Sequence, residues 1–154
     1  MFNQLLPRQI DNTYRGHKLA LWLLGLVVLV RFIQSLVLLF NGYSVVMSAD
    51  GIPLDTYPPA AAQTIVALFS LAAVSRLFIL LLCVLALVRY RRAIPFMFAL
   101  LLLSYLAGQL LLQFVPMVRT GAPRAQTVNL VLFALMIIGL ALSLWRRRNL
   151  QAQE

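Results

Sequence analysis

The stretch LALWLLGLVVLVRFIQSLVLLF, Leu19 to Phe40, decides the fold class of this chain. An apolar helix of about 20 residues is long enough to cross the hydrocarbon core of a bilayer, which is about 30 Å thick. The run is too long for the apolar region of a cleaved signal peptide, and it carries a charged residue, Arg31, near its middle. We therefore interpret it as a membrane span that contains one chemical anomaly.

The rest of the chain has the same character. Of its 154 residues, 62% are hydrophobic and only 11% are charged, whereas about a quarter are charged in a typical soluble domain. Three further apolar runs are long enough to span, at about 64–88, 93–118 and 128–145. The sequence predicts an all-α, integral membrane four-helix transmembrane bundle, with residues 1–154 forming a single four-span membrane domain.

The connections between the spans differ in length. RYRR, Arg89 to Arg92, is short enough to make the second and third spans antiparallel neighbours. Outer loops are expected at about 41–63 and 119–127. Within the first of these, Asp50-Gly51 predicts either a small hairpin or an irregular loop.

Basic residues predict the orientation. Nine of them lie in the N-terminal tail up to Lys18, in the RYRR link and in the C-terminal RRR run at 146–148, whereas Arg119 and Arg124 are alone on the other side. Loops rich in Lys and Arg stay in the cytoplasm. We therefore expect a multi-pass protein of the bacterial inner (plasma) membrane with both termini cytoplasmic, N-in and C-in.

Two segments carry a resemblance to known proteins: PRQIDNTYRGHKLALW, residues 7–22, and FNGYSVVMSADGIPLDTYPPAAAQT, residues 40–64. With them the chain resembles a family of small, uncharacterised bacterial integral membrane proteins with four predicted helices. The resemblance covers most of the chain and implies the four-helix fold. It implies no activity, and no functional residue can be transferred.

The position of the polar residues along the spans predicts a site. Arg31 lies 13 residues after Lys18, Arg76 lies 13 residues before Arg89, and Tyr105 lies 13 residues after Arg92, so the three share one depth. Gln34, Gln109 and Asn129 fall about one helical turn further from the basic ends. The candidate intramembrane polar site therefore consists of Arg31, Gln34, Arg76, Tyr105, Gln109 and Asn129.

Counter-charges for the two arginines are missing from the spans. The four acidic residues, Asp11, Asp50, Asp55 and Glu154, all lie in tails or loops, and we expect none to reach the depth of Arg31 or Arg76. Four explanations stay open. The guanidinium groups make structural contacts with water, amides or carbonyls; they bind an anionic or carbonyl-bearing ligand; they pair with an acid of a partner's transmembrane helix; or they serve ion or solute transport.

The sequence also limits the chemistry. Its one cysteine, Cys83, excludes an internal disulfide, and its one histidine, His17, has no second ligand nearby. The predicted spans hold no histidine, no acid and no cysteine pair, so we expect no catalytic residues, no metal site, no cofactor and no enzymatic activity. The net charge of +9 is explained by membrane topology, so we expect no binding to nucleic acid.

The function that these features favour is that of a non-enzymatic accessory or interaction protein. The alternative is a binding protein or carrier for an anionic or carbonyl-bearing small molecule or lipid, which would use the intramembrane arginines. The partners to consider are the lipid bilayer, a homo-oligomer or membrane protein partner, and a bound lipid or quinone.

Overall fold

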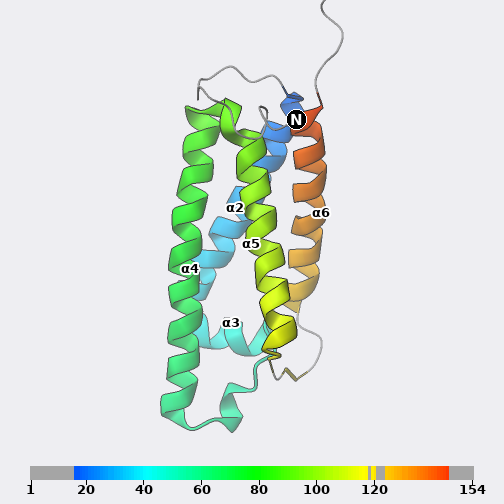
Figure 1. Ribbon diagram of the computed structural model, residues 1–154. Coiled ribbons are helices and arrows are strands. Elements are labelled where there is room, and N and C mark those ends of the chain that lie inside the picture. Colours follow the sequence, from blue (N-terminus) through cyan, green and yellow to red (C-terminus); the bar gives the residue numbers. More distant parts are fainter. Residues whose placement is uncertain (1–15, 118, 121–123, 146–154) are drawn as a thin grey trace, which may run out of the picture.

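The computed structural model describes residues 16–117, 119–120 and 124–145, and this part of the chain contains helices and no strand. Four helices are long and apolar enough to cross a membrane: α2 (Lys18–Phe40), α4 (Pro59–Val88), α5 (Ile94–Phe114, preceded by the 3-10 turn η2, Arg91–Ala93) and α6 (Arg124–Leu144). The prediction of four apolar spans is confirmed. Figure 1 shows them side by side as an up-and-down bundle.

Proline placement explains where the observed helices differ from the predicted spans. α4 begins at Pro59, five residues before the predicted start, because proline is tolerated in the first turn of a helix. α5 ends at Phe114, since Val115 precedes Pro116 and is disfavoured in helical geometry there. The predicted end of that span, Val118, lies outside the described residues. α6 begins at Arg124, four residues before the predicted start.

The connection between α2 and α4 is not the predicted hairpin. Asn41 ends α2, and a short helix, α3 (Gly42–Ser48), follows at once and lies across the end of the bundle (Figure 1). A 3-10 turn, η1 (Leu54–Thr56), leads on to α4. The hairpin alternative is wrong because the residues before Asp50-Gly51 form a helix that packs between α2 and α4.

The bundle has two ends that can be named by their connections. The link end holds the Arg89–Arg92 connection together with the start of α2 and the end of α6, which are joined by a hydrogen bond from His17 N to Leu142 O of 3.2 Å. The α3 end holds α3, η1 and the start of α6. Every described terminus therefore lies at the same end as the basic link.

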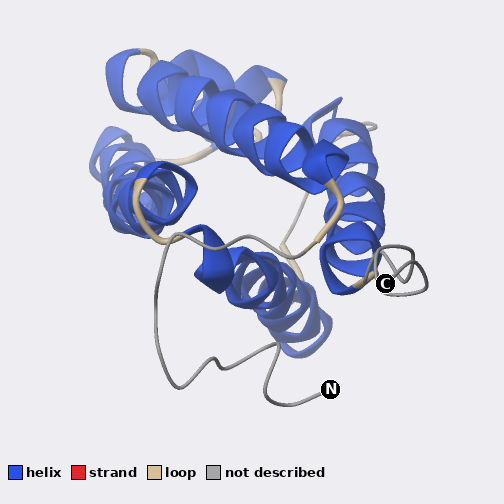
Figure 2. Ribbon diagram, turned by 90° about the horizontal axis from the view of Figure 1, so that it is seen from above, coloured by secondary structure: helices blue, strands red, loops and turns tan. Residues whose placement is uncertain are grey.

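Two separate apolar cores lie along the bundle axis. α2 packs against both α4 and α6, and α6 packs against α5, so the helices surround one interior (Figure 2). The link-end core joins all four long helices: it contains Ala20, Leu24, Val27, Val28, Leu80, Cys83, Ile94, Phe98, Leu101, Leu132 and Met136. The α3-end core joins only α2, α3, α4 and the loop between them: it contains Leu38, Val46, Ile52, Leu54, Ala62 and Ala73.

Candidate functional site

Arg31 lies between the two cores and connects two helices. It sits on α2 and is half-buried, and its Nη1 donates a hydrogen bond of 2.8 Å to Oδ1 of Asn129 on α6. The two residues are 98 positions apart in the sequence, so the bond fixes how these helices are placed relative to each other. An amide oxygen accepts a hydrogen bond but carries no negative charge. The positive charge of Arg31 is therefore solvated but not neutralised by Asn129.

Arg76 reaches the same region from α4. Its side chain is half-buried, and the positive charges of Arg31 and Arg76 repel each other. The structure shows no hydrogen bond from Arg76 to another described residue. Its electrostatic attraction is to Asp50. Two cations thus approach each other within a bundle whose surroundings are apolar, which is costly unless acceptors or anions lie close by.

Asp50 corrects an expectation drawn from the sequence. We expected no acid to come near the arginines, but α3 folds back across the bundle and brings Asp50 toward Arg76 and Arg119. Burial raises the pKa of the Asp50 carboxyl group above its ordinary value, and the positive charges of Arg119 and Arg76 act in the opposite direction. Asp50 is thus attracted both to Arg76 on α4 and to Arg119 in the connection between α5 and α6.

The segment that carries Asp50 is fixed by backbone hydrogen bonds. Gly51 O accepts from Thr120 N at 2.8 Å and from Thr120 Oγ1 at 3.3 Å, and Ala49 O accepts from Ala125 N at 3.1 Å. Gly51 has a φ of 71°, a left-handed conformation that glycine adopts without the strain a side chain would bring. These bonds attach the end of α3 to the connection between α5 and α6, and they hold Asp50 in place.

The charges of this region do not balance. Arg31, Arg76 and Arg119 contribute three positive charges, and Asp50 contributes one negative charge that acts on two of them. Asp55, the other described acid, accepts instead from Tyr43 Oη at 2.9 Å on the exposed side of α3. The site therefore keeps an excess of positive charge.

The remaining predicted site residues are joined less closely. Tyr105 on α5 is half-buried, interacts electrostatically with Arg31, and stacks on Phe133 with the ring centroids 4.8 Å apart. Gln34, one turn after Arg31, has a buried Oε1 that accepts no hydrogen bond from any residue that the structure describes. Gln109 is half-buried, and the structure shows no hydrogen bond between it and another described residue. The structure thus brings Arg31, Asn129, Arg76 and Tyr105 together, and it does not connect Gln109 to them.

The burial along α5 explains why its polar residues, Tyr105, Gln109 and Gln113, are not fully buried. Its buried residues, Ile94, Pro95, Phe98 and Leu101, all lie in its first two turns. From Leu102 to Phe114 the helix buries no residue, and Gln113 is exposed. The polar face of α5 therefore contains no fully buried residue, and of its members only Tyr105 interacts with Arg31.

Asp50 is the residue that sequence reasoning missed. The signal lay in GYSVVMSADG, residues 42–51, which is long enough for two helical turns and ends in the turn dipeptide Asp50-Gly51. A helix over these residues directs the chain back toward the bundle, so that Asp50, which follows the helix, comes within electrostatic range of Arg76.

The side chains that most often bind metal ions are not grouped in the part of the chain that the structure describes. Among residues 16–117, 119–120 and 124–145, no group of three His, Cys, Asp or Glu side chains is placed to hold a metal ion. Comparisons with protein-family models, with curated proteins and with solved structures give no match.

Proposed function

We propose that this protein is a non-enzymatic membrane protein that binds an anionic or carbonyl-bearing small molecule or lipid through Arg31 and Arg76. The observation that carries the proposal is the excess of positive charge where α2 and α4 meet: two half-buried arginines that repel each other, with one acid, Asp50, shared with Arg119. A ligand with negative or strongly accepting oxygens would remove this repulsion.

The hydrogen-bonding groups fit such a ligand. A guanidinium group offers five N–H donors in a planar fork that matches a carboxylate or phosphate. Arg31 uses one of these donors on Asn129, and Arg76 uses none on a described residue. A carboxylate, a lipid phosphate or a quinone carbonyl is the chemistry that these donors would recognise.

An accessory or interaction protein is the second candidate, and a different observation favours it. The second half of α5 carries Tyr105, Gln109 and Gln113 on one face, four residues apart; Gln113 is exposed, and Tyr105 and Gln109 are half-buried. A partner's transmembrane helix with an acidic residue would cover this face and pair with the arginines. A second copy of the chain lacks an acid within its spans and would not supply that charge.

The proposed location is a bacterial inner membrane, with the link end in the cytoplasm. The support is the asymmetry of basic residues, which gather beside the link end. A cysteine placed at Thr120 should then react with a reagent added from the periplasmic side, and one placed at Asn149 should not. The native Cys83 is fully buried and should stay silent. The reverse pattern of labelling would contradict this orientation.

The binding proposal is tested by replacing Arg31 and Arg76 with Met, singly and together, and by examining the purified proteins by native mass spectrometry. We expect the wild type to carry a small anionic or carbonyl-bearing molecule, and the double variant to lose it while remaining folded, because buried charged groups often tolerate apolar replacement. Arg124→Met, at an exposed helix start, is the matched control.

The outcomes separate the candidates. A co-purifying protein that is lost with the arginines would favour the accessory function over ligand binding. A wild type without any bound species, and a double variant that is equally stable and functional in cells, would show that the arginines are only structural. Lys at the same positions keeps the charge and loses the planar fork, so a site that reads a carboxylate bidentately should weaken with Lys as well.

A further inference from the structure

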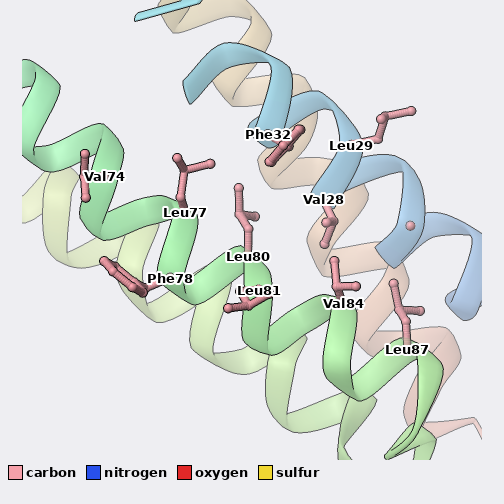
Figure 3. A pocket seen from close by; sticks show the side chains of 11 residues that line it. Val28, Leu29, Phe32, Val74, Leu77, Phe78, Leu80, Leu81, Val84 and Leu87 are labelled. Atoms are coloured by element: carbon pink, nitrogen blue, oxygen red, sulfur yellow. The ribbon is translucent and has the colours of Figure 1, made fainter. Parts of the chain in front are cut away.

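A long apolar groove lies on the outside of the bundle, between α2 and α4. The two helices are close near the α3 end and move apart toward the link end (Figure 1). Two adjoining cavities fill this widening space, one of about 610 Å³ and one of about 560 Å³. They share Gly25, Leu29 and Leu87 as lining residues, so they form one continuous groove. Apolar side chains of α4 and α2 flank the larger cavity, as Figure 3 shows.

Gly25 keeps the groove open. A Cβ atom placed on Gly25 would meet no atom within 4 Å. The lining of the larger cavity is apolar throughout, from Val74 and Phe78 to Leu87 on α4. The absence of a side chain at Gly25 therefore leaves space for hydrocarbon from outside the protein.

The groove changes character at the link end. There its lining includes Arg91, which is exposed and whose Nε donates a hydrogen bond of 3.2 Å to the carbonyl oxygen of Leu87, itself a lining residue. This bond keeps the guanidinium group at the mouth of the groove. The two described acids, Asp50 and Asp55, lie at the α3 end, so neither is placed to neutralise Arg91. Trp22 lines the same mouth and is 79% exposed, a position typical of indole rings at the level of lipid head groups.

The dimensions match one lipid leaflet. From Val74 to Leu87 the groove follows 14 residues of α4, which is about 20 Å of helix. Half of a bilayer core is about 15 Å thick. A chain that starts at the head-group level beside Arg91 would therefore lie in the groove for the whole depth of its leaflet.

We propose that this groove binds one anionic glycerophospholipid, with an acyl chain between α2 and α4 and the phosphate at Arg91. Charge complementarity decides between occupants: an apolar transmembrane helix, from a partner or a second copy, would fill the groove but offer no anion to Arg91. An α-helix with its side chains is also about 10–12 Å wide, whereas the groove continues between the two helices as far as Val28 and Leu80 on their facing sides. The site is independent of Arg31 and Arg76.

Native mass spectrometry tests the proposal with phosphatidylglycerol as the probe and phosphatidylcholine as the uncharged comparison. We expect the full-length protein to retain one phosphatidylglycerol with about fivefold preference, the effect of one basic residue near an anionic lipid. Gly25→Leu should reduce retention of both lipids, because it fills the groove. Gly108→Leu is the matched control, since a Cβ there also meets nothing within 4 Å. Arg91→Gln should abolish the preference for the anionic lipid, and Arg89→Gln, at an exposed neighbouring position, should not.

A fluorescence measurement keeps the test independent of the folding of the Gly25 variant. With Trp145 replaced by Phe, Trp22 is the one remaining indole. Phosphatidylglycerol with brominated acyl chains should quench it more than brominated phosphatidylcholine at the same mole fraction, and Arg91→Gln should remove the difference. Three results would each overturn the proposal. The first is equal quenching by the two lipids in the wild type, the second is unchanged lipid retention in folded Gly25→Leu, and the third is conversion of a dimer to a monomer by Gly25→Leu. The last result would assign the groove to a second copy of the chain.

Discussion

The two ends of the bundle are built in different ways. At the link end, side chains from all four long helices meet in one apolar core. At the α3 end, the core contains α2, α3 and α4 but nothing from α5 or α6, which are held there by the backbone bonds of Thr120 and Ala125. Between the two cores lie Arg31, Arg76 and Asn129. The difference indicates that the link end carries the stability of the fold, and that the α3 end is free to carry polar chemistry.

The largest expected effect is at Gly139, where α6 packs against Phe98 of α5. A Cβ atom at Gly139 would overlap the ring of Phe98, which is fully buried. We expect Gly139→Leu to lower the free energy of unfolding by more than about 3 kcal/mol, at the upper end of the cost of overpacking. Thermal unfolding in mild detergent measures the effect. Gly108→Leu, at an open position of α5, should leave the midpoint nearly unchanged. Equal effects of the two variants would contradict the assignment of stability to the link end.

The polar layer should respond less strongly. Asn129→Leu removes the acceptor of the Arg31 hydrogen bond and leaves a charged donor unpaired in the bundle. We expect a loss of about 1–3 kcal/mol in the free energy of unfolding, the usual cost of an unsatisfied buried group. Gln126→Leu, an exposed position one turn earlier on α6, is the control. If the two variants are equally stable, Arg31 is solvated by other groups and the bond does not connect α2 to α6.

The same contrast explains what the sequence could and could not predict. The apolar runs, together with the basic residues Lys18, Arg89 and Arg92 beside them, were sufficient to predict four spans, because span length and hydropathy are local properties of the sequence. Equal spacing also placed Arg31 and Arg76 at one level, and the structure places them within electrostatic range of each other. The course of residues 42–50 was not predictable from spacing, because a short helix is decided by what it packs against. Asp50 was correctly assigned to the connection between the first two spans, but its attraction to Arg76 was not predicted.

The smallest expected effect concerns Asp50 at the α3 end, and its sign follows from its pKa. Because burial raises the pKa of this carboxyl group in the folded protein, the folded state holds its proton more tightly than the unfolded state. Its contribution to stability is then fully present below the ordinary Asp value of 3.8 and is lost as the pH rises through the higher value of the folded state. The unfolding midpoint in mild detergent should rise by a few degrees when the pH falls from 7 toward 4. Asp50→Asn should remove that part of the dependence, whereas Asp55→Asn, in the 3-10 turn η1 where the carboxyl group is exposed, should retain it. A midpoint that falls on acidification, and that loses this fall in Asp50→Asn, would show instead that attraction to Arg76 and Arg119 outweighs burial. Asp50 would then be the built-in counter-ion of the site, and the α3 end would be more tightly held than its sparse core indicates.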